Sequence, residues 1–310
     1  MSGQPKQLDL FNGSSGVKHK SPLLPAYHAN RDFFTADLFD VALKSDRASM
    51  EVPLFSLATK PDLSICQWSS KDGSRMLRVV PSVLGRATQM DKDVLIFLIS
   101  QLMQAKNIKR MDAHNRCVQF TAYDYLVATN KRTDGKEYRR LDFALKRLLG
   151  TTIFTNIKTN RVEKDDGFNL LERVRKIRQS STDTRMIAIE ITLSEWLFNA
   201  ICADEVLTLS SDYFRIRQPL ARRLYELARK HCGNQAMWKI SFAWLHAKSG
   251  SSSSLREFRR KTKGIAQNDF PDYRIQIDET VDQVIFLSKD AKKVIKAMIK
   301  HEQSKKRISP

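Results

Sequence analysis

The amino-acid sequence predicts an α+β protein built from two similar modules that follow one another along the chain. The 310 residues are 42% hydrophobic, which is enough to bury more than one core. The order helix, short strand, helix, turn, basic helix and hairpin occurs twice. Between Arg215 and Lys263, thirteen Lys and Arg residues stand against two Glu residues and supply +11 of the formal net charge of +19. A surface that binds a polyanion is therefore expected.

The chain divides into four predicted regions. Residues 1–30 are rich in Gly, Pro and Ser with little periodicity, which is typical of a flexible arm. A first domain at 31–200 carries an added β-hairpin, and a second domain occupies 201–290. Residues 291–310 end in a Lys-rich run, and such a run usually forms a solvated tail.

The first domain alternates short strands with helices. Its predicted elements are, in order, a hairpin at 65–69 and 75–80, a helix after Asp91, a strand at 117–120, a helix capped by Thr121 that runs to Ala128, a helix at 137–149, and strands at 151–158, 170–177 and 186–192. The helix after Asp91 is apolar nearly all round. Such a helix is either central to a core or shared with a partner subunit.

The second domain repeats this order in a shorter form. Its predicted elements are a helix at 219–231, a strand at 238–242, a short helix at 243–248, a basic helix at 255–267, and a hairpin at 273–277 and 283–287. Gly250 and the four serines that follow it supply a turn and an N-cap. A helix-turn-helix followed by a hairpin is the winged-helix form of DNA-binding module. The sequence therefore predicts two tandem winged-helix domains.

The basic helix at 255–267 has two distinct faces. Leu255, Phe258, Thr262 and Ile265 share one face, while Arg256, Arg260 and Lys263 share the opposite face, with Arg259 and Lys261 beside them. In a helix-turn-helix the second helix enters the major groove, where Arg can bind guanine through two hydrogen bonds. Arg256, Arg259, Arg260, Lys261 and Lys263 are therefore predicted to contact DNA, in preference to forming an ordinary solvated helix face.

Other basic residues are expected to anchor the DNA backbone. In the second domain these are Arg215, Arg217, Arg222, Arg223, Arg229 and Lys230, which suit phosphate contacts better than base contacts. From Lys131 to Arg178 the first domain holds fourteen basic and seven acidic residues. Its candidate DNA contacts are Arg139, Arg140 and Arg147. The alternative for this domain is a structural or dimerising role.

The arm carries one cluster of large apolar residues in an otherwise polar segment. Gln7, Leu8, Asp9, Leu10 and Phe11 resemble the pentapeptide with which bacterial proteins bind the replicative sliding clamp. Leu10 and Phe11 would enter an apolar groove and Gln7 would supply a polar anchor, with the cost of ordering offset by the buried side chains. The alternative is that the arm packs on its own domain.

Together these features resemble the plasmid replication initiators of the replication-initiator-protein-A group, which share the tandem winged-helix plan of iteron-binding Rep proteins. The resemblance covers about residues 30–290. It implies binding to double-stranded DNA at repeats in a plasmid origin, melting of an AT-rich segment with contact to single-stranded DNA, and recruitment of the host initiator ATPase, helicase and clamp. It also implies a homodimer that represses its own gene and a monomer that starts replication.

Several other classes of protein fit the sequence less well. The chain lacks a phosphate-binding Gly-x-x-x-x-Gly-Lys-Ser/Thr loop and lacks the paired histidines that a rolling-circle nickase needs, so no enzyme activity is expected. Dispersed cysteines and histidines predict no metal, disulfide or cofactor. Without a membrane span or a secretion signal, a cytoplasmic protein is expected. A winged-helix transcriptional repressor without a direct replication role remains the main alternative.

Overall fold

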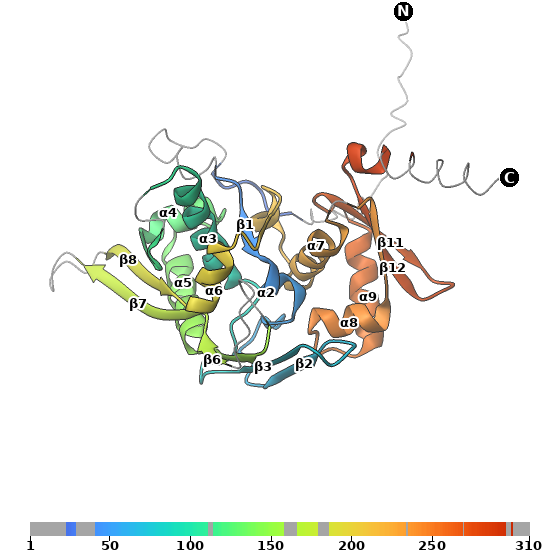
Figure 1. Ribbon diagram of the computed structural model, residues 1–310, viewed down its shortest axis with the longest axis horizontal. Coiled ribbons are helices and arrows are strands. Elements are labelled where there is room, and N and C mark those ends of the chain that lie inside the picture. The colour runs from blue at the N-terminus through green and yellow to red at the C-terminus, as the bar shows by residue number, and fades with distance from the viewer. Residues whose placement is uncertain are drawn as a thin grey trace, which may run out of the picture.

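The computed structural model describes residues 23–28, 41–110, 114–157, 166–178, 186–233, 235–268, 270–295 and 299 of the chain. Within these ranges it is a mixed helix and sheet structure, which confirms the predicted α+β class (Figure 1). The predicted clamp-binding pentapeptide lies outside the described residues, as does the C-terminal tail except for residues 291–295 and 299. Among the described helices, none combines the length and apolar character that crossing a lipid bilayer requires.

The first module contains the elements that the sequence predicts, together with one further strand. Its elements are β2 (Cys66–Ser69), β3 (Met76–Val80), α3 (Lys92–Asn107), β4 (Cys117–Phe120), α4 (Ala122–Ala128), α5 (Gly135–Gly150), β5 (Thr152–Thr155), β6 (Asp166–Asn169), β7 (Leu171–Arg178) and β8 (Met186–Leu193). Helix α5 starts earlier than predicted because the side chain of Asp134 accepts hydrogen bonds from the N–H groups of Lys136 and Glu137. Strand β5 pairs with the predicted hairpin and the additional strand β6 pairs with β5, which gives a sheet of order β2-β3-β5-β6.

The second module repeats the topology of the first. Its elements are α7 (Pro219–Cys232), β10 (Met237–Ser241), α8 (Phe242–Ser249), α9 (Leu255–Ala266), β11 (Tyr273–Asp278) and β12 (Gln283–Ser288). The antiparallel sheet has the order β10-β12-β11, and the first module has the equivalent order β4-β8-β7. In both sheets the strand that follows the first helix pairs with the last strand of the module. The repeated order predicted from the sequence is therefore present in three dimensions.

The turn between α8 and α9 requires glycine for two reasons. Gly250 ends α8 with φ of +71°, a left-handed conformation that side chains with a Cβ atom rarely adopt. A Cβ atom at this position would also lie 2.4 Å from the Cβ atom of Pro53. Ser254 then begins α9, because its hydroxyl accepts a hydrogen bond from the N–H group of Glu257.

Several short elements that the sequence pattern did not predict join the two modules. They are β1 (Lys44–Asp46), α2 (Arg47–Glu51), α6 (Glu195–Cys202), β9 (Val206–Thr208) and the single 3₁₀ turn η3 (Tyr213–Arg215). Strand β1 pairs antiparallel with β9, so residues before the first module hydrogen-bond to the connection between the modules. A strand of three residues is too short to show an alternating pattern.

Residues 23–28, which the sequence places in the flexible arm, contact the first module and the connection that leads into the second. Leu23 forms an isolated antiparallel bridge with Ile216, and the N–H group of Leu24 donates to the carbonyl of Arg215 at 2.7 Å. The N–H group of Tyr27 donates to Asn130 Oδ1 at 2.8 Å. The expectation of a flexible arm is therefore wrong for these six residues.

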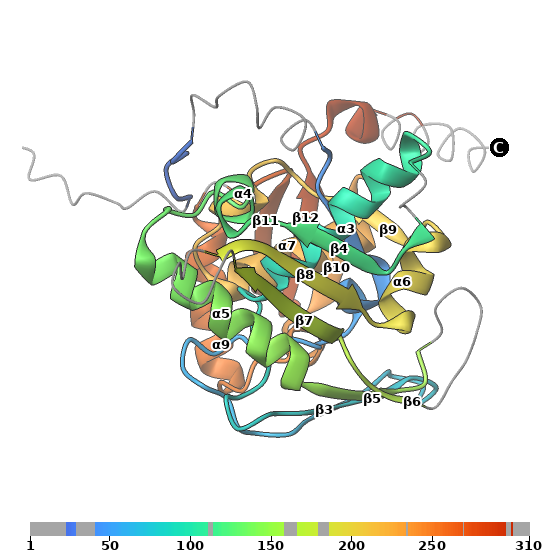
Figure 2. The same ribbon diagram turned by 90° about the vertical axis from the view of Figure 1, so that its left-hand side faces the viewer.

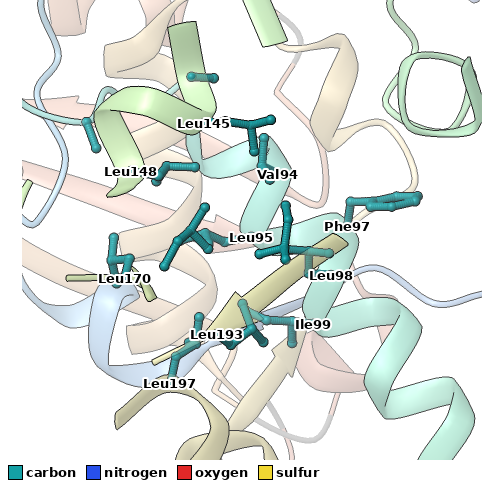
Figure 3. Close-up of a cluster of buried hydrophobic side chains, with 14 of the residues drawn as sticks. Val94, Leu95, Phe97, Leu98, Ile99, Leu145, Leu148, Leu170, Leu193 and Leu197 are labelled. Atoms are coloured by element: carbon teal, nitrogen blue, oxygen red, sulfur yellow. The ribbon is translucent and has the colours of Figure 1, made fainter. Parts of the chain in front are cut away.

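Helix α3 lies at the centre of the molecule. Val94, Leu95, Leu98 and Ile99 are completely buried, with Leu145 and Leu148 of α5 on one side and Leu193 and Leu197 on another (Figure 3). Ile96 faces the second core instead, where it joins Met50 and Leu224. The apolar surface all round α3 is thus shared between the two modules of one chain, and it is not required for contact with a partner subunit.

Charged side chains are also buried where α3 meets α7. Lys92 Nζ lies 2.9 Å from Glu226 Oε2, and Arg222 pairs with Asp93, and all four side chains are completely buried. Glu226 Oε1 also accepts hydrogen bonds at 2.7 Å from Gln89 Nε2 and from the Tyr213 hydroxyl. Buried charges of this kind are tolerated only when they are paired and hydrogen-bonded. This cluster therefore joins the N-terminal end of α3, in the first module, to α7, the first helix of the second module.

The structure corrects the sequence interpretation of Arg222 and Arg223. Both were expected to contact phosphate, but both are buried. The guanidinium of Arg222 donates to the carbonyls of Phe214 and Ile216 in addition to its pair with Asp93. The guanidinium of Arg223 donates to the carbonyls of Ser49, Met50, Glu51 and Lys248. They hold elements of the two modules together and cannot reach DNA in this fold.

We predict that Glu226→Gln lowers the free energy of unfolding by about 3 kcal/mol, because Lys92 keeps its charge in a buried site without a carboxylate. Urea unfolding monitored by circular dichroism measures the change. The matched control is Glu257→Gln on the surface of α9, where the ion pair is exposed and screened by solvent, so its loss should change the unfolding midpoint much less. Equal unfolding midpoints for the two variants would contradict the role given to this pair.

Candidate nucleic-acid interface

The exposed face of α9 carries the predicted basic stripe. Arg256, Arg260 and Lys263 are exposed on this face, while Phe258, Thr262 and Ile265 are buried on the other. The predicted division of this helix into two faces is thus confirmed. Gly264 and Gln267 are also exposed and extend the same stripe by their spacing. Neither residue was predicted from the sequence, although their positions eight and eleven residues after Arg256 continue the helical spacing.

Most basic side chains of α9 form ion pairs with carboxylates of the same chain. Arg260 forms two hydrogen bonds of 2.8 Å with Glu257, and Lys263 Nζ lies 2.6 Å from Glu279 Oε1. Within the described ranges, Arg256 is not paired with a carboxylate. Exposed ion pairs contribute only about 0–1 kcal/mol each, so a phosphate or a base edge can replace these carboxylates at little cost.

Arg259 differs from its neighbours because it connects α9 to the hairpin of the second module. Its guanidinium forms hydrogen bonds of 3.1 and 2.5 Å with Asp282, and it lies 5.6 Å from the ring centre of Phe242. These contacts give Arg259 a structural role. Its contact with DNA stays a prediction. The hairpin turn also carries Asp278 and Glu279, so its tip is negatively charged and poorly suited to contact phosphate.

Helix α5 of the first module presents a second basic surface. Arg139, Arg140 and Lys146 are exposed on it, together with the ring of Phe143. Helices α5 and α9 both lie toward the left side of Figure 2, although Figure 1 shows them in different modules. The basic helices of the two modules therefore lie on the same side of the molecule. Arg140 is mostly exposed and pairs with Glu137 one turn earlier.

Arg147 at the end of α5 is only partly available to DNA. Its Nε and Nη2 atoms donate to the two carboxylate oxygens of Asp91, at 2.7 and 2.6 Å. These hydrogen bonds raise the pKa of the Arg147 guanidinium, against the opposing effect of burial. Arg147 thus anchors α5 to the start of α3, and a DNA contact through its remaining N–H groups stays a prediction.

The other predicted phosphate contacts have different surroundings. Arg215 donates from Nε to the carbonyl of Leu24 at 2.8 Å and pairs with Asp212 at 2.6 Å. Arg229 Nε donates to the carbonyl of Thr208 at 2.6 Å. Burial lowers the pKa of Lys230. Arg217 is exposed, and the described residues give it neither an ion pair nor a hydrogen bond, so it is the best placed of these residues to meet a ligand.

The chain also matches a known protein family over most of its length. A model of the family described as Replication initiator protein A matches residues 44–275, a range that includes α3, α5 and α9. The chain belongs to the replication initiator protein A family. A protein of Wigglesworthia glossinidia brevipalpis described as a replication protein is 36% identical over 276 residues, which covers 87% of this chain and 98% of that protein. The resemblance inferred from the sequence is thereby confirmed.

Solved structures show that the fold has been seen elsewhere. Two crystal structures of domains 2 and 3 of RctB align with TM-scores of 0.56 and 0.52, each at 14% sequence identity. They cover 79% and 78% of this chain, and 98% and 97% of the RctB chains. At this identity the comparison establishes a shared α+β arrangement across both modules. The shared fold extends over nearly the whole of the matched RctB fragments.

The pair between Arg260 and Glu257 can be tested by titration. The hydrogen bonds from Arg260 are the main cause that lowers the pKa of Glu257 to about 2, with smaller effects from Lys261. We predict that carboxyl carbon shifts in NMR spectra give a midpoint near this value, and that Arg260→Gln raises it toward the ordinary glutamate value of about 4.3. Lys261→Gln should raise it less. Equal shifts in both variants would contradict the geometry described for α9.

Proposed function

We propose that this family member is a sequence-specific, non-enzymatic DNA-binding protein that initiates plasmid replication at repeated sites in an origin. The observation that carries the proposal is the exposed stripe of Arg256, Arg260 and Lys263 on α9, whose opposite face is buried. Arg side chains on such a stripe can read guanine in the major groove with about 1–3 kcal/mol of discrimination for each pair of hydrogen bonds. Membership of the initiator family supports the biological setting.

In this proposal each module is a winged-helix domain, with α9 and α5 as the helices that approach DNA. The order of helices and strands in both modules, and the sheet orders β10-β12-β11 and β4-β8-β7, support this assignment. Arg256 and Arg260 read bases, and Lys263 contacts bases or the adjoining backbone. Lys261, Arg217, Arg139 and Arg140 neutralise phosphate. Since α5 and α9 lie on one side of the molecule, a single duplex can contact both (Figure 2).

In this proposal, the free energy needed to open the origin comes from the binding of the protein to DNA. Additional protein contacts to bent or locally unwound DNA can offset the cost of unstacking base pairs. In this scheme the host initiator ATPase, the helicase and the sliding clamp are recruited partners, and single-stranded DNA is a second ligand. A homodimer that represses its own gene fits the same DNA surface. A transcriptional repressor would share these modules but would not need the pentapeptide at residues 7–11.

Selection from a random duplex pool tests sequence-specific binding. At near-physiological salt, which suppresses non-specific phosphate binding, we expect one motif to be enriched. Arg256→Ala should weaken binding to this motif by about 1–3 kcal/mol and relax selection at one base position, because that side chain reads a base. Arg274→Ala on strand β11 removes the same charge and should leave the motif unchanged. Failure of the wild-type protein to enrich any motif would overturn the proposal.

The pentapeptide has its own test. We predict that the protein binds purified sliding clamp and that Leu10→Ala/Phe11→Ala abolishes this binding, because the two apolar side chains supply the buried contact. DNA affinity should stay at the wild-type value, since residues 7–11 lie outside both modules. Surface plasmon resonance with immobilised clamp measures the interaction. Undiminished clamp binding by the double variant would rule out this role for the pentapeptide.

A further inference from the structure

A cleft of about 400 Å³ opens where the first module meets the second. Its walls come from the loop at 58–61, from Pro219 at the start of α7, and from residues of the first module. These are Thr88, Met90, Asp91, Tyr125, Lys131, Arg140, Leu141, Ala144 and Arg147. Small-molecule sites in proteins have volumes of about 300–1,000 Å³. The cleft therefore has room for a phosphate group with its adjoining sugar.

Positive charge dominates the lining of this cleft. Lys60, Lys131, Arg140 and Arg147 line it, and among the described lining residues Asp91 is the one acidic side chain. Asp91 cannot repel an anion strongly, because both of its carboxylate oxygens accept hydrogen bonds from Arg147. The lining residues taken together therefore carry an excess of positive charge.

The carboxylate beside Lys131 does not cancel this excess. Lys131 Nζ lies 2.5 Å from Asp93 Oδ2, and Asp93 also pairs with the buried Arg222. Asp93 thus shares one negative charge between two cations. A net positive charge remains next to the cleft, which favours binding of an anion.

The basic groups that line the cleft have hydrogen-bond donors to spare. Lys60 is exposed, and the described residues offer it neither a carboxylate nor a hydrogen-bond acceptor. Arg147 uses Nε and Nη2 on Asp91, and within the described ranges its Nη1 hydrogens are not taken up. Arg140 can join them by exchanging its exposed pair with Glu137. Arginine and lysine donors converging on one space suit a phosphate group.

We propose that this cleft binds a phosphate of the DNA backbone, at a point between the segments of duplex that α5 and α9 contact. The inference rests on the proposed function, and it adds Lys60 and Lys131 to the DNA surface. Because α5 and the first residue of α7 both line the cleft, a phosphate held there touches both modules at once. The cleft thereby fixes the register of one module on DNA relative to the other, without reading sequence itself.

The test is the salt dependence of DNA binding by Lys60→Gln in the full chain. Removing one phosphate contact should reduce the slope of log K against log salt by about 0.9, with the selected motif unchanged. Lys60→Gln/Arg140→Gln should reduce the slope by about twice as much. Arg78→Gln is the matched control, because it removes one exposed charge from strand β3, away from the lining residues, and should leave the slope at the wild-type value.

A wild-type salt slope in Lys60→Gln would overturn the inference. If calorimetry then showed that the wild type binds inorganic pyrophosphate and that Lys60→Gln does not, the cleft would serve a free phosphate ligand instead of the DNA backbone. Failure of the proposed function looks different, because the wild-type protein would then select no DNA motif. The two failures are therefore distinguishable in the same set of experiments.

Discussion

The arrangement of the two modules depends on the charged side chains buried between α3 and α7. Lys92 and Asp93 open α3, and Glu226 and Arg222 lie on α7, so each helix supplies one acid and one base to the cluster. Removing such charges from water is costly, and the cost is recovered only when every partner is in place. A slipped or rotated contact between the modules would leave a charge unpaired. The cluster therefore favours one relative orientation of the modules more than it adds to stability.

The relative orientation of the modules determines where the basic helices α5 and α9 lie on the surface. Because α3 contributes to both cores, the modules cannot separate without exposing apolar side chains of that helix. The same packing sets α5 and α9 on one side of the molecule (Figure 2). Most basic groups on α9 rest against exposed carboxylates, which lowers the attraction for arbitrary polyanions. These exposed pairs are weak, so a ligand of matching charge and geometry can displace them.

The local sequence pattern predicted most of the helices and strands. The features that it did not predict depend on contacts between residues far apart in the sequence. Helix α9 was predicted correctly because its apolar residues recur at helical spacing and Ser254 provides a cap. Strand β1 was missed, since its partner β9 is far away in the sequence and each strand has three residues. The burial of Arg222 was also missed, because its partner Asp93 lies in the other module. The salt bridge from Arg259 to Asp282 likewise depends on the folded hairpin, so composition alone overstated the charge available to DNA.

The proposed function requires one duplex to contact both α5 and α9 of a single chain. Hydroxyl-radical footprinting of the full-length protein on its selected site tests it most directly. If both helices bind, two protected backbone segments are expected on one face of the duplex, separated by one helical turn of about 10 base pairs, with further protection between them if the cleft binds a phosphate. A single short protected segment, unchanged by substitutions in α5, would show that the second module binds alone and would contradict the account.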